Sequence, residues 1–179
     1  MKITVSDRIT LREIEMADAI NIFQTIDSQR DYLGRWLPFV EFTKSVDFSR
    51  SFIQSILDTP FENREHTFVV LYDGEFAGVI GFKGTDRSNK KTEIGYSLSE
   101  SYQHKGLITD SVPALMKFAF DELDMNRIQI RCGVGNTPSR KIPIRSGFRF
   151  EGIERAGELF PDGKFVDLEV YSKLKDDKE

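Results

Sequence analysis

The chain has 179 residues, of which 39% are hydrophobic and 30% charged, and this composition suits one globular domain with a substantial core. A net charge of −4 argues against a broadly nucleic-acid-binding surface, which requires a clustered excess of Lys and Arg. No run approaches the roughly 20 apolar residues of a membrane span, and the opening MKITVSDRITL lacks a signal-peptide core, so we expect a cytoplasmic protein that does not associate with membranes.

The first half of the chain predicts a strand, two helices and a hairpin. Alternation over 8–14 indicates the strand, and Asp18 can then cap a helix. The segment YLGRWLPF over 32–39 is typical of a turn, and Ser45 can cap the second helix. We expect the buried faces of the two helices to carry Ile20, Ile22, Phe23 and Ile26, and Phe48, Phe52, Ile53, Ile56 and Leu57. HTFVVLYD and FAGVIGFKG then form a hairpin with Asp73-Gly74 in its turn.

The second half predicts further strands alternating with two helices. Residues 92–98 form a strand and RIQIRCGV another, and the segment between them has helical spacing. The face of that long helix is expected to comprise Val112, Leu115, Met116, Ala119, Phe120 and Leu123. A shorter helix is expected from about 138 to 146 with Gly147 at its C′ position, and two last strands flank the turn at 161–163.

This order of elements predicts a mixed α/β sheet flanked by helices. The unit through 92–133 should be a right-handed parallel crossover. No repeat or linker divides the chain, so we expect one domain over residues 1–175 and a frayed tail at 176–179.

The loop QHKGLI, from Gln103 to Ile108, lies between a strand and the start of the long helix. The first turn of a helix has unpaired N–H groups and the positive end of the macrodipole, which together favour a diphosphate. Gly106 allows close approach of the main chain, and Lys105 adds positive charge. The pattern alone also fits an ordinary polar loop that caps a helix.

This loop resembles motif A of the GNAT superfamily of N-acetyltransferases, which is written Arg/Gln-x-x-Gly-x-Gly/Ala and binds the pyrophosphate of acetyl-CoA. Ile108 departs from the last position of the motif. The element order is also similar to that of the superfamily, which has a strongly twisted sheet. Within it, RxxLREI, YLGRWLPF, EIGYSL followed by YQHKGLIT, and NTPSRKIPIRSGFRFEG resemble the Rim-type ribosomal-protein Nα-acetyltransferases. The resemblance implies acetyl-CoA as cosubstrate, with the loop residues Gln103, His104, Lys105, Gly106, Leu107, Ile108 and Thr109 at the cofactor.

Acetyl transfer to an amine needs a neutral nucleophile, and Glu93 is the candidate base. Period-2 alternation places Glu93 on one strand face with Gly95 and Ser97, so we expect only small neighbours around its carboxylate. A carboxylate in such a cleft can take the ammonium proton through an intervening water. The alternative is a solvated strand Glu or an ion-pair partner.

Other site residues are implied by the resemblance. Ser97 and Leu98 match the main-chain groups that bond pantetheine and polarise the thioester, and Asn136 matches the family Asn on the pantetheine arm, although it can also cap the following helix. Many relatives place a Tyr acid where this chain has Pro143. Ser139 of Asn-x-x-Ser is our replacement, as a donor to the departing thiolate or as a cap, and Tyr171 is a further donor or a core residue.

The acetyl acceptor is the part of the reaction that the sequence constrains least. A free α-amino group has roughly 300 times the neutral fraction of a lysine at neutral pH, so a modest base suits a protein N-terminus. Tyr32, Trp36 and Phe39 are candidate walls of the acceptor cleft or core residues. A small amine as acceptor, or a silent acyl-CoA-binding module, are the alternatives.

Remaining features bear on thiol chemistry, metals and assembly. Cys132 is the only cysteine and is expected to be a buried, inert thiol, which also excludes an internal disulfide. His66 and His104 are far apart in sequence, so we expect no metal site. The 15 Phe residues permit an apolar interface, and we expect a homo-oligomer.

Overall fold

The computed structural model describes residues 1–177, which form two compact units. The first unit comprises residues 1–81 and 96–107, and the second comprises 82–95 and the chain from 108 onward. The elements are β1 (Lys2–Thr4), β2 (Ile9–Glu13), η1 (Met16–Asp18), α1 (Ala19–Ser28), α2 (Arg30–Gly34), α3 (Phe39–Phe42), α4 (Val46–Leu57), η2 (Phe61–Asn63), β3 (Thr67–Tyr72), β4 (Glu75–Asp86), β5 (Lys91–Leu98), η3 (Glu100–Tyr102), α5 (Leu107–Asp121), β6 (Arg127–Gly133), α6 (Thr137–Arg145), β7 (Arg149–Leu159) and β8 (Phe165–Leu174).

The strands are hydrogen-bonded in the order β1-β2-β3-β4-β5-β6-β8-β7, which confirms the mixed α/β sheet. All described pairings are antiparallel except that of β5 with β6, where Lys91, Thr92 and Glu93 pair with Arg127, Ile128 and Gln129. The predicted parallel crossover is therefore present. Within residues 1–177, no helix has the length and apolar character needed to cross a membrane.

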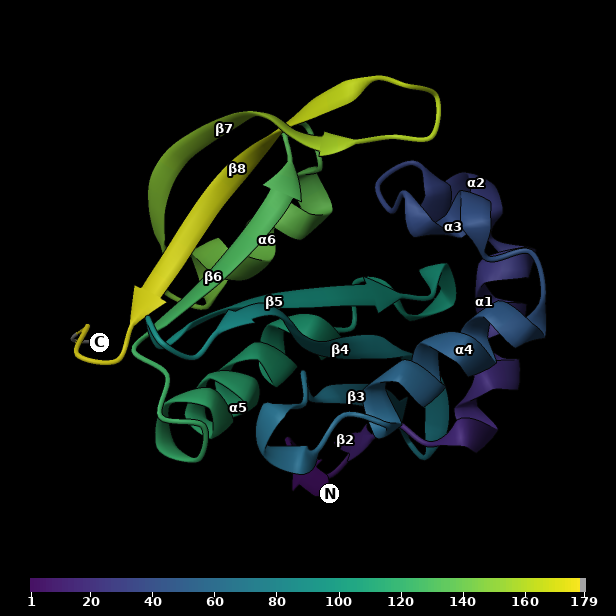
Figure 1. The fold of residues 1–179 in the computed structure, drawn as a ribbon, viewed down its shortest axis with the longest axis horizontal. Helices are drawn as coiled ribbons and strands as arrows, with labels where there is room; N and C mark the ends of the chain where they lie inside the picture. The colour runs from purple at the N-terminus through teal and green to yellow at the C-terminus, as the bar shows by residue number, and fades with distance from the viewer. Residues whose placement is uncertain (178–179) are drawn as a thin grey trace. The chain divides into compact units, whose positions relative to one another are not determined.

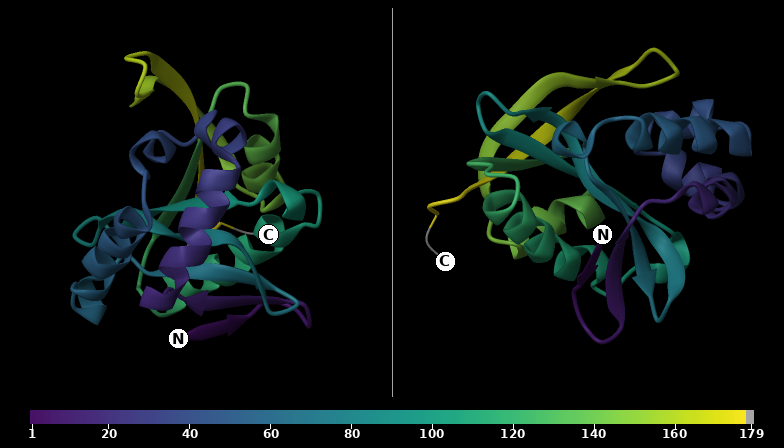
Figure 2. Two further views of the ribbon diagram at one scale, coloured as in Figure 1. Left: turned by 90° about the vertical axis from the view of Figure 1, so that its right-hand side faces the viewer. Right: turned by 60° about the horizontal axis from the view of Figure 1, so that its bottom comes forward.

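In the first unit the hairpin of β3 and β4 has the predicted turn. Asp73 and Gly74 both have positive φ, 51° and 86°, as a type I′ turn requires, and Tyr72 pairs with Glu75 across it. The short strand β1, which pairs with β2, was not predicted, because three residues are too few to show alternation. It lies beside the N-terminus in the right-hand view of Figure 2.

The helices α1 and α4 pack side by side in the first unit (Figure 1). Their shared core includes Ile22, Ile26, Leu33, Ile53 and Val69. The segment 32–39, predicted as a turn, contains most of α2 and the first residue of α3. Helices this short span too little sequence to show a 3.6-residue period, so the pattern did not reveal them.

Several predicted core and capping roles in these helices were wrong. Ile20, Phe48 and Phe52 are 50%, 54% and 47% exposed. The Asp18 carboxylate does not cap α1; it accepts from the Glu15 N–H at 2.7 Å and pairs with Arg12. The Ser45 side chain likewise makes no capping bond to α4. The ion pair with Arg12 of β2 and the capping box of η1 with Glu15 occupy the Asp18 carboxylate that we expected to cap α1.

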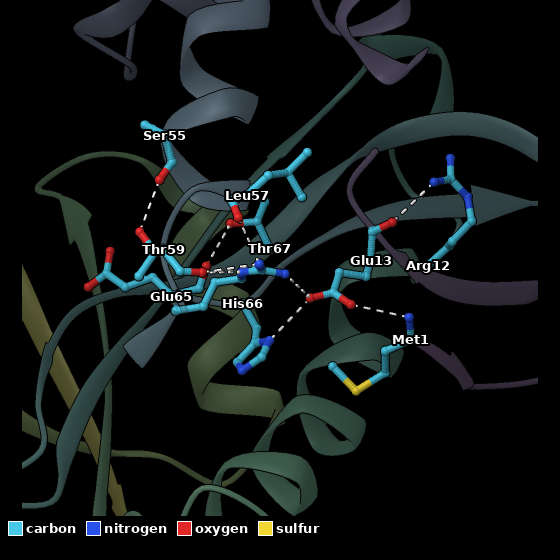
Figure 3. A network of polar contacts seen from close by, with 10 residues as sticks. Met1, Arg12, Glu13, Ser55, Leu57, Thr59, Glu65, His66 and Thr67 are labelled. Atoms are coloured by element: carbon cyan, nitrogen blue, oxygen red, sulfur yellow. Dashed lines mark hydrogen bonds and ion pairs between the residues drawn. The ribbon is translucent and has the colours of Figure 1, made fainter. Parts of the chain in front are cut away.

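Glu13 on β2 joins separate parts of the first unit (Figure 3). Its carboxylate accepts from the Met1 ammonium at 3.2 Å and lies 3.3 Å from His66 Nδ1 and 3.4 Å from an Arg64 nitrogen. Burial alone would raise the pKa of Glu13, but the bonds from Met1 and His66 outweigh it and lower the pKa. His66, which directly precedes β3, therefore belongs to a structural network of polar side chains.

In the second unit α6 packs on β6, β7 and β8, and β7 and β8 form the long hairpin of Figure 1. Gly147 has φ +72°, and Phe148 N–H donates to the Pro143 carbonyl at 2.9 Å, so the helix ends in the predicted glycine C-cap. On α5, Val112, Leu115 and Ala119 are fully buried as predicted. Residues 178 and 179 of the expected tail lie outside the described residues, and Asp177 accepts from Leu174 N–H at 2.9 Å.

The Arg127–Glu151 pair across this sheet gives a pH-dependent prediction. Arg127 donates to Glu151 at 2.7 Å, and Ser172 Oγ donates to the same carboxylate at 2.7 Å. These bonds lower the Glu151 pKa from 4.5 to about 2. Because the folded-state pKa is the lower one, the pair's stability is fully present above pH 4.5 and is lost as pH falls toward 2.

Glu151→Gln should therefore lower the free energy of unfolding by about 1 kcal/mol at neutral pH, a value reduced for solvent screening of a half-exposed side chain. Urea titrations at decreasing pH measure it, with Glu158→Gln, a half-buried residue of the same strand, as control. A difference from wild type that stays constant down to the acid limit would contradict the prediction.

Candidate active site

The loop from Gln103 to Ile108 connects β5 and η3 to α5, which begins at Leu107. His104 and Gly106 have positive φ, 62° and 77°. Gly106 is thus required by its backbone conformation as well as by the close approach that the sequence suggested. The first-turn N–H groups of α5 follow directly, so the loop has the main-chain donors that suit a diphosphate. Ile108 is buried within the helix and Thr109 is half-buried.

Gln103 connects this loop to the segment 32–39. Its side-chain amide donates to the Tyr32 hydroxyl of α2, and burial is the main cause that raises the pKa of Tyr32. Trp36 is half-buried and Phe39 is 46% exposed. The structure therefore brings one predicted wall residue into contact with the predicted cofactor loop.

Gln29 is a residue of this region that the sequence reasoning missed. Its side chain donates to Ser99 Oγ at 3.0 Å and accepts from Glu100 N–H at 2.8 Å. These bonds tie the end of α1 to the turn after β5. A single Gln after a helix carries no signal for a contact some 70 residues away in sequence.

The end of β5 lies very close to β4 in the first unit. Ser97 and Leu98 are half-buried, and Ser99 N–H donates to the Ala77 carbonyl at 2.9 Å. A Cβ on Gly78 would lie 2.2 Å from the Ser97 carbonyl oxygen. Gly78 therefore sets the position of the main chain at the predicted pantetheine contacts.

Glu93 has long charged neighbours, so the expectation of only small ones was wrong. Its carboxylate accepts from Arg131 Nε at 2.7 Å and Gln129 Nε2 at 3.0 Å, and lies 3.0 Å from Lys83 Nζ. The residue is 5% exposed. Alternation along one strand describes only that strand, whereas these side chains come from β4 and β6.

This geometry matches the ion-pair alternative for Glu93. Each donor occupies a lone-pair direction that a transferred proton would otherwise use. Arg131 also contacts Glu154 at 2.9 Å, so it is shared between two carboxylates. A base role for Glu93 remains a prediction that requires one of these donors to move.

Asn136 and Ser139 lie together at the start of α6. Asn136 Oδ1 accepts from Ser139 N–H at 3.3 Å, which confirms the capping alternative and leaves the side-chain amide nitrogen as a donor. The Ser139 side chain also hydrogen-bonds the Cys132 thiol. Cys132 is buried as expected, and burial is the main cause that raises its pKa to about 11.

A buried polar group beside Cys132 was not predicted. Glu169 pairs with Cys132 in the β6–β8 register, accepts from the Tyr171 hydroxyl at 2.6 Å and lies 3.3 Å from Arg140 Nε. Burial first, and then the bond to Glu169, raise the pKa of Tyr171. The Tyr171 proton is therefore engaged by Glu169, which weakens its case as the thiolate donor.

Residues 8–149 match the model of the acetyltransferase (GNAT) domain family. The chain belongs to the GNAT acetyltransferases. It is 37% identical over 177 residues to the putative ribosomal N-acetyltransferase YdaF of Bacillus subtilis, covering 96% of this chain and 93% of that protein. It is 28% identical to the ribosomal-protein-serine acetyltransferase of Escherichia coli, covering 97% of both.

Solved structures agree with this GNAT assignment. The RimL ribosomal L7/L12 alpha-N-protein acetyltransferase in complex with coenzyme A has a TM-score of 0.91 at 26% identity, covering 97% of this chain and 98% of that one. The microcin C7 self-immunity acetyltransferase MccE in complex with acetyl-CoA and AMP has a TM-score of 0.90 at 28% identity, covering 96% and 95%.

The GNAT chain is thus an acetyl-CoA-dependent N-acetyltransferase. Among residues 1–177, no group of three or more His, Cys, Asp and Glu side chains is arranged to hold a metal ion. The main-chain conformation at His104 and Gly106, with Lys105 between them, fits the diphosphate of the cosubstrate.

Cys132→Ala should keep the acetyl-transfer rate of this GNAT enzyme within about threefold of wild type, because a thiol with a pKa of about 11 is almost fully protonated at neutral pH and is a poor nucleophile. Steady-state kinetics with both substrates varied measure the effect. Loss of activity together with a ping-pong pattern would indicate an acetyl-cysteine intermediate instead.

Proposed function

We propose that this GNAT enzyme transfers acetyl from acetyl-CoA directly to the α-amino group of a protein N-terminus, with ribosomal proteins as the acceptor class. The observation that carries the proposal is the likeness, over at least 96% of the chain, to relatives named as ribosomal N-acetyltransferases, in sequence and in fold. A cytoplasmic location follows from that acceptor class.

The proposed roles follow the predicted residues. Main-chain groups of loop 103–109 hold the diphosphate, Ser97, Leu98 and Asn136 hold pantetheine and the thioester, and Glu93 is the base. Ser139 donates to the developing thiolate; its hydroxyl already bonds the Cys132 thiol, so it is oriented within a set of polar groups. Tyr32, Trp36 and Phe39 contact the acceptor.

Chemistry favours an N-terminal amine over a lysine. The α-amino group is the more weakly basic, so a larger share is neutral at neutral pH and less is demanded of the base. The Glu93 carboxylate, already paired with Arg131 and Lys83, suits this less demanding proton transfer.

Assembly into a homo-oligomer is also proposed, supported by the exposed Phe42, Phe48 and Phe52 of α3 and α4.

A small amine is the second candidate acceptor. The spermidine N(1)-acetyltransferase of Escherichia coli is 26% identical over 159 residues, covering 88% of this chain and 81% of that protein. A silent acyl-CoA-binding module is the third, because Ile108 departs from motif A and Pro143 stands where many relatives have Tyr.

Release of CoA from acetyl-CoA tests the three. The purified chain is offered N-terminal peptides of ribosomal proteins, the same peptides with blocked α-amino groups, and polyamines. We expect turnover only with unblocked peptides, with acetylation mapped to the first residue by mass spectrometry. Turnover confined to polyamines would replace the proposed acceptor, and binding of acetyl-CoA without turnover would indicate the silent module.

A further inference from the structure

A cluster of cations and aromatic rings lies beside the cofactor loop in the first unit. Lys105 Nζ lies 5.2 Å from the ring centroid of Tyr72 and 4.9 Å from that of Tyr102. The two rings meet edge to face, with centroids 6.0 Å apart. Arg8 lies over the Tyr72 ring at 4.3 Å. We call these residues, Arg8, Tyr72, Tyr102 and Lys105, the tyrosine clamp.

The strand register explains why these distant residues meet. Ile9 of β2 pairs with Tyr72 of β3, so Arg8 lies at the end of that ladder, and Asp73 N–H donates to the Arg8 carbonyl at 2.8 Å. Glu75 of β4 pairs with Tyr72, and the Ser99 N–H, directly after β5, donates to the Ala77 carbonyl of β4 at 2.9 Å, so the ends of β3 and β5 lie close together beside η3 and the loop. Lys105 therefore reaches from the loop toward the end of β3.

The clamp carries an excess of positive charge. Arg8 donates to Asp73 at 2.9 Å, and this bond is the main cause that lowers the pKa of Asp73. Arg8 and Asp73 compensate each other, so Lys105 remains as the surplus cation. Its ammonium is held against two ring faces, and among residues 1–177 no carboxylate lies within ion-pairing distance of it.

Such a lysine is suited to a phosphate monoester. An ammonium recognises phosphate as a point charge, and a phosphate monoester is largely a dianion at neutral pH. The rings fix a side chain that would otherwise lose conformational freedom on binding, which lowers the cost of using it. All parts of the clamp are surface-accessible to some degree, as a nucleotide end requires.

Coenzyme A carries two separate phosphate groups, the 5′-diphosphate and the 3′-phosphate of the same ribose. The main chain around Gly106 suits the diphosphate, and the Lys105 ammonium lies against the rings of Tyr72, at the end of β3, and Tyr102. One anion-binding site on the main chain and a second one at a side-chain ammonium match the two phosphate groups of one cosubstrate.

We propose that the tyrosine clamp binds the 3′-phosphate of the cosubstrate and makes the enzyme discriminate acetyl-CoA from its 3′-dephospho form. Lys105 makes the contact, Tyr72 and Tyr102 position its side chain, and Arg8 adds long-range attraction. The proposal deepens the cofactor side of the proposed function and is independent of the identity of the acceptor.

Calorimetric binding of CoA and 3′-dephospho-CoA to the full chain, with no acceptor present, tests it. Lys105→Met keeps the side-chain stem and removes the charge. We expect it to weaken CoA binding about tenfold, the effect of about 1.4 kcal/mol, and dephospho-CoA binding less than twofold. Lys164→Met, at an exposed lysine paired with Asp162 in the β7–β8 turn, is the matched control and should change neither.

A second variant tests the charge balance by removing a negative charge in place of a positive one. Asp73→Asn removes the carboxylate that opposes the clamp, so CoA should bind about twofold to threefold more tightly and dephospho-CoA should not. Equal weakening of both ligands by Lys105→Met would place the lysine at the diphosphate and overturn the proposal. Equal affinity of the wild type for CoA and dephospho-CoA would overturn it as well. Neither result depends on peptide acetylation.

Discussion

Replacing Gly78 with alanine is expected to cost about 3 kcal/mol of unfolding free energy and most of the acetyl-transfer activity. The added Cβ would lie 2.2 Å from the Ser97 carbonyl oxygen and 3.0 Å from Leu98 Cα. Both are backbone atoms of β5 and cannot rotate away, so the strands must separate. Overpacking a tight interior costs about 1–3 kcal/mol, and contact with backbone falls at the upper end.

The loss of activity has a separate cause from the loss of stability. Ser97 and Leu98 are the proposed main-chain contacts of the thioester arm, and a shift of about 1 Å in such groups can cost about a hundredfold in rate. Urea unfolding gives the first quantity, and steady-state kinetics at a temperature where the variant is folded give the second.

Gly95→Ala is the matched control, because its Cβ would meet only the flexible Lys83 side chain at 3.4 Å. We expect it to change the free energy of unfolding by less than about 1 kcal/mol. If Gly78→Ala proved as stable and active as Gly95→Ala, the close approach of β4 and β5 would not be a constraint on the enzyme.

Glu93→Gln is expected to reduce kcat about a hundredfold, the usual effect of removing a general base, and to lower the free energy of unfolding by about 2 kcal/mol. The second effect follows from the structure, since Arg131 and Lys83 would lose a carboxylate that is 5% exposed. It stays below the full cost of breaking a buried pair because half of the Lys83 side chain is exposed.

The companion variant Arg131→Gln separates the two roles. It breaks the same ion pair, at 2.7 Å, but keeps the Glu93 carboxylate. A base role predicts that Arg131→Gln keeps kcat within about tenfold while Glu93→Gln does not. Pre-steady-state rates and unfolding curves of both variants decide it. Similar stability losses with kcat unchanged in both would leave Glu93 as an ion-pair partner only.

Much of the fold was predictable because its signals are local. Asp73-Gly74 predicts a type I′ turn since both residues tolerate positive φ, and both have it. Gly147 after an amphipathic segment predicts a helix end for the same reason, and the spacing of Val112, Leu115 and Ala119 predicts a buried helical face. The loop at 103–108 and the segment around Asn136 were sufficient to indicate the GNAT family.

The errors share a different physical origin. Phe48 and Phe52 have the hydrophobic spacing of a core face, yet the core of α4 is built around Ile53 and the two rings stay exposed. Asp18 had the position of a cap, but the Arg12 guanidinium attracts its carboxylate from the neighbouring strand. In both cases contacts beyond the helix itself outweighed a weak local preference.

The longer elements, the hairpin turn, the cofactor loop and the family were therefore readable from the sequence, because each depends on φ preferences, periodicity or motif spacing within a short segment. What surrounds the candidate groups was visible only in the tertiary structure: Arg131 at Glu93, Arg140 at Glu169, Tyr32 at Gln103, and Arg8 and Tyr72 of the tyrosine clamp near Lys105. Those contacts arise from strand register and helix packing, which bring side chains together across tens of residues and leave no trace in local spacing.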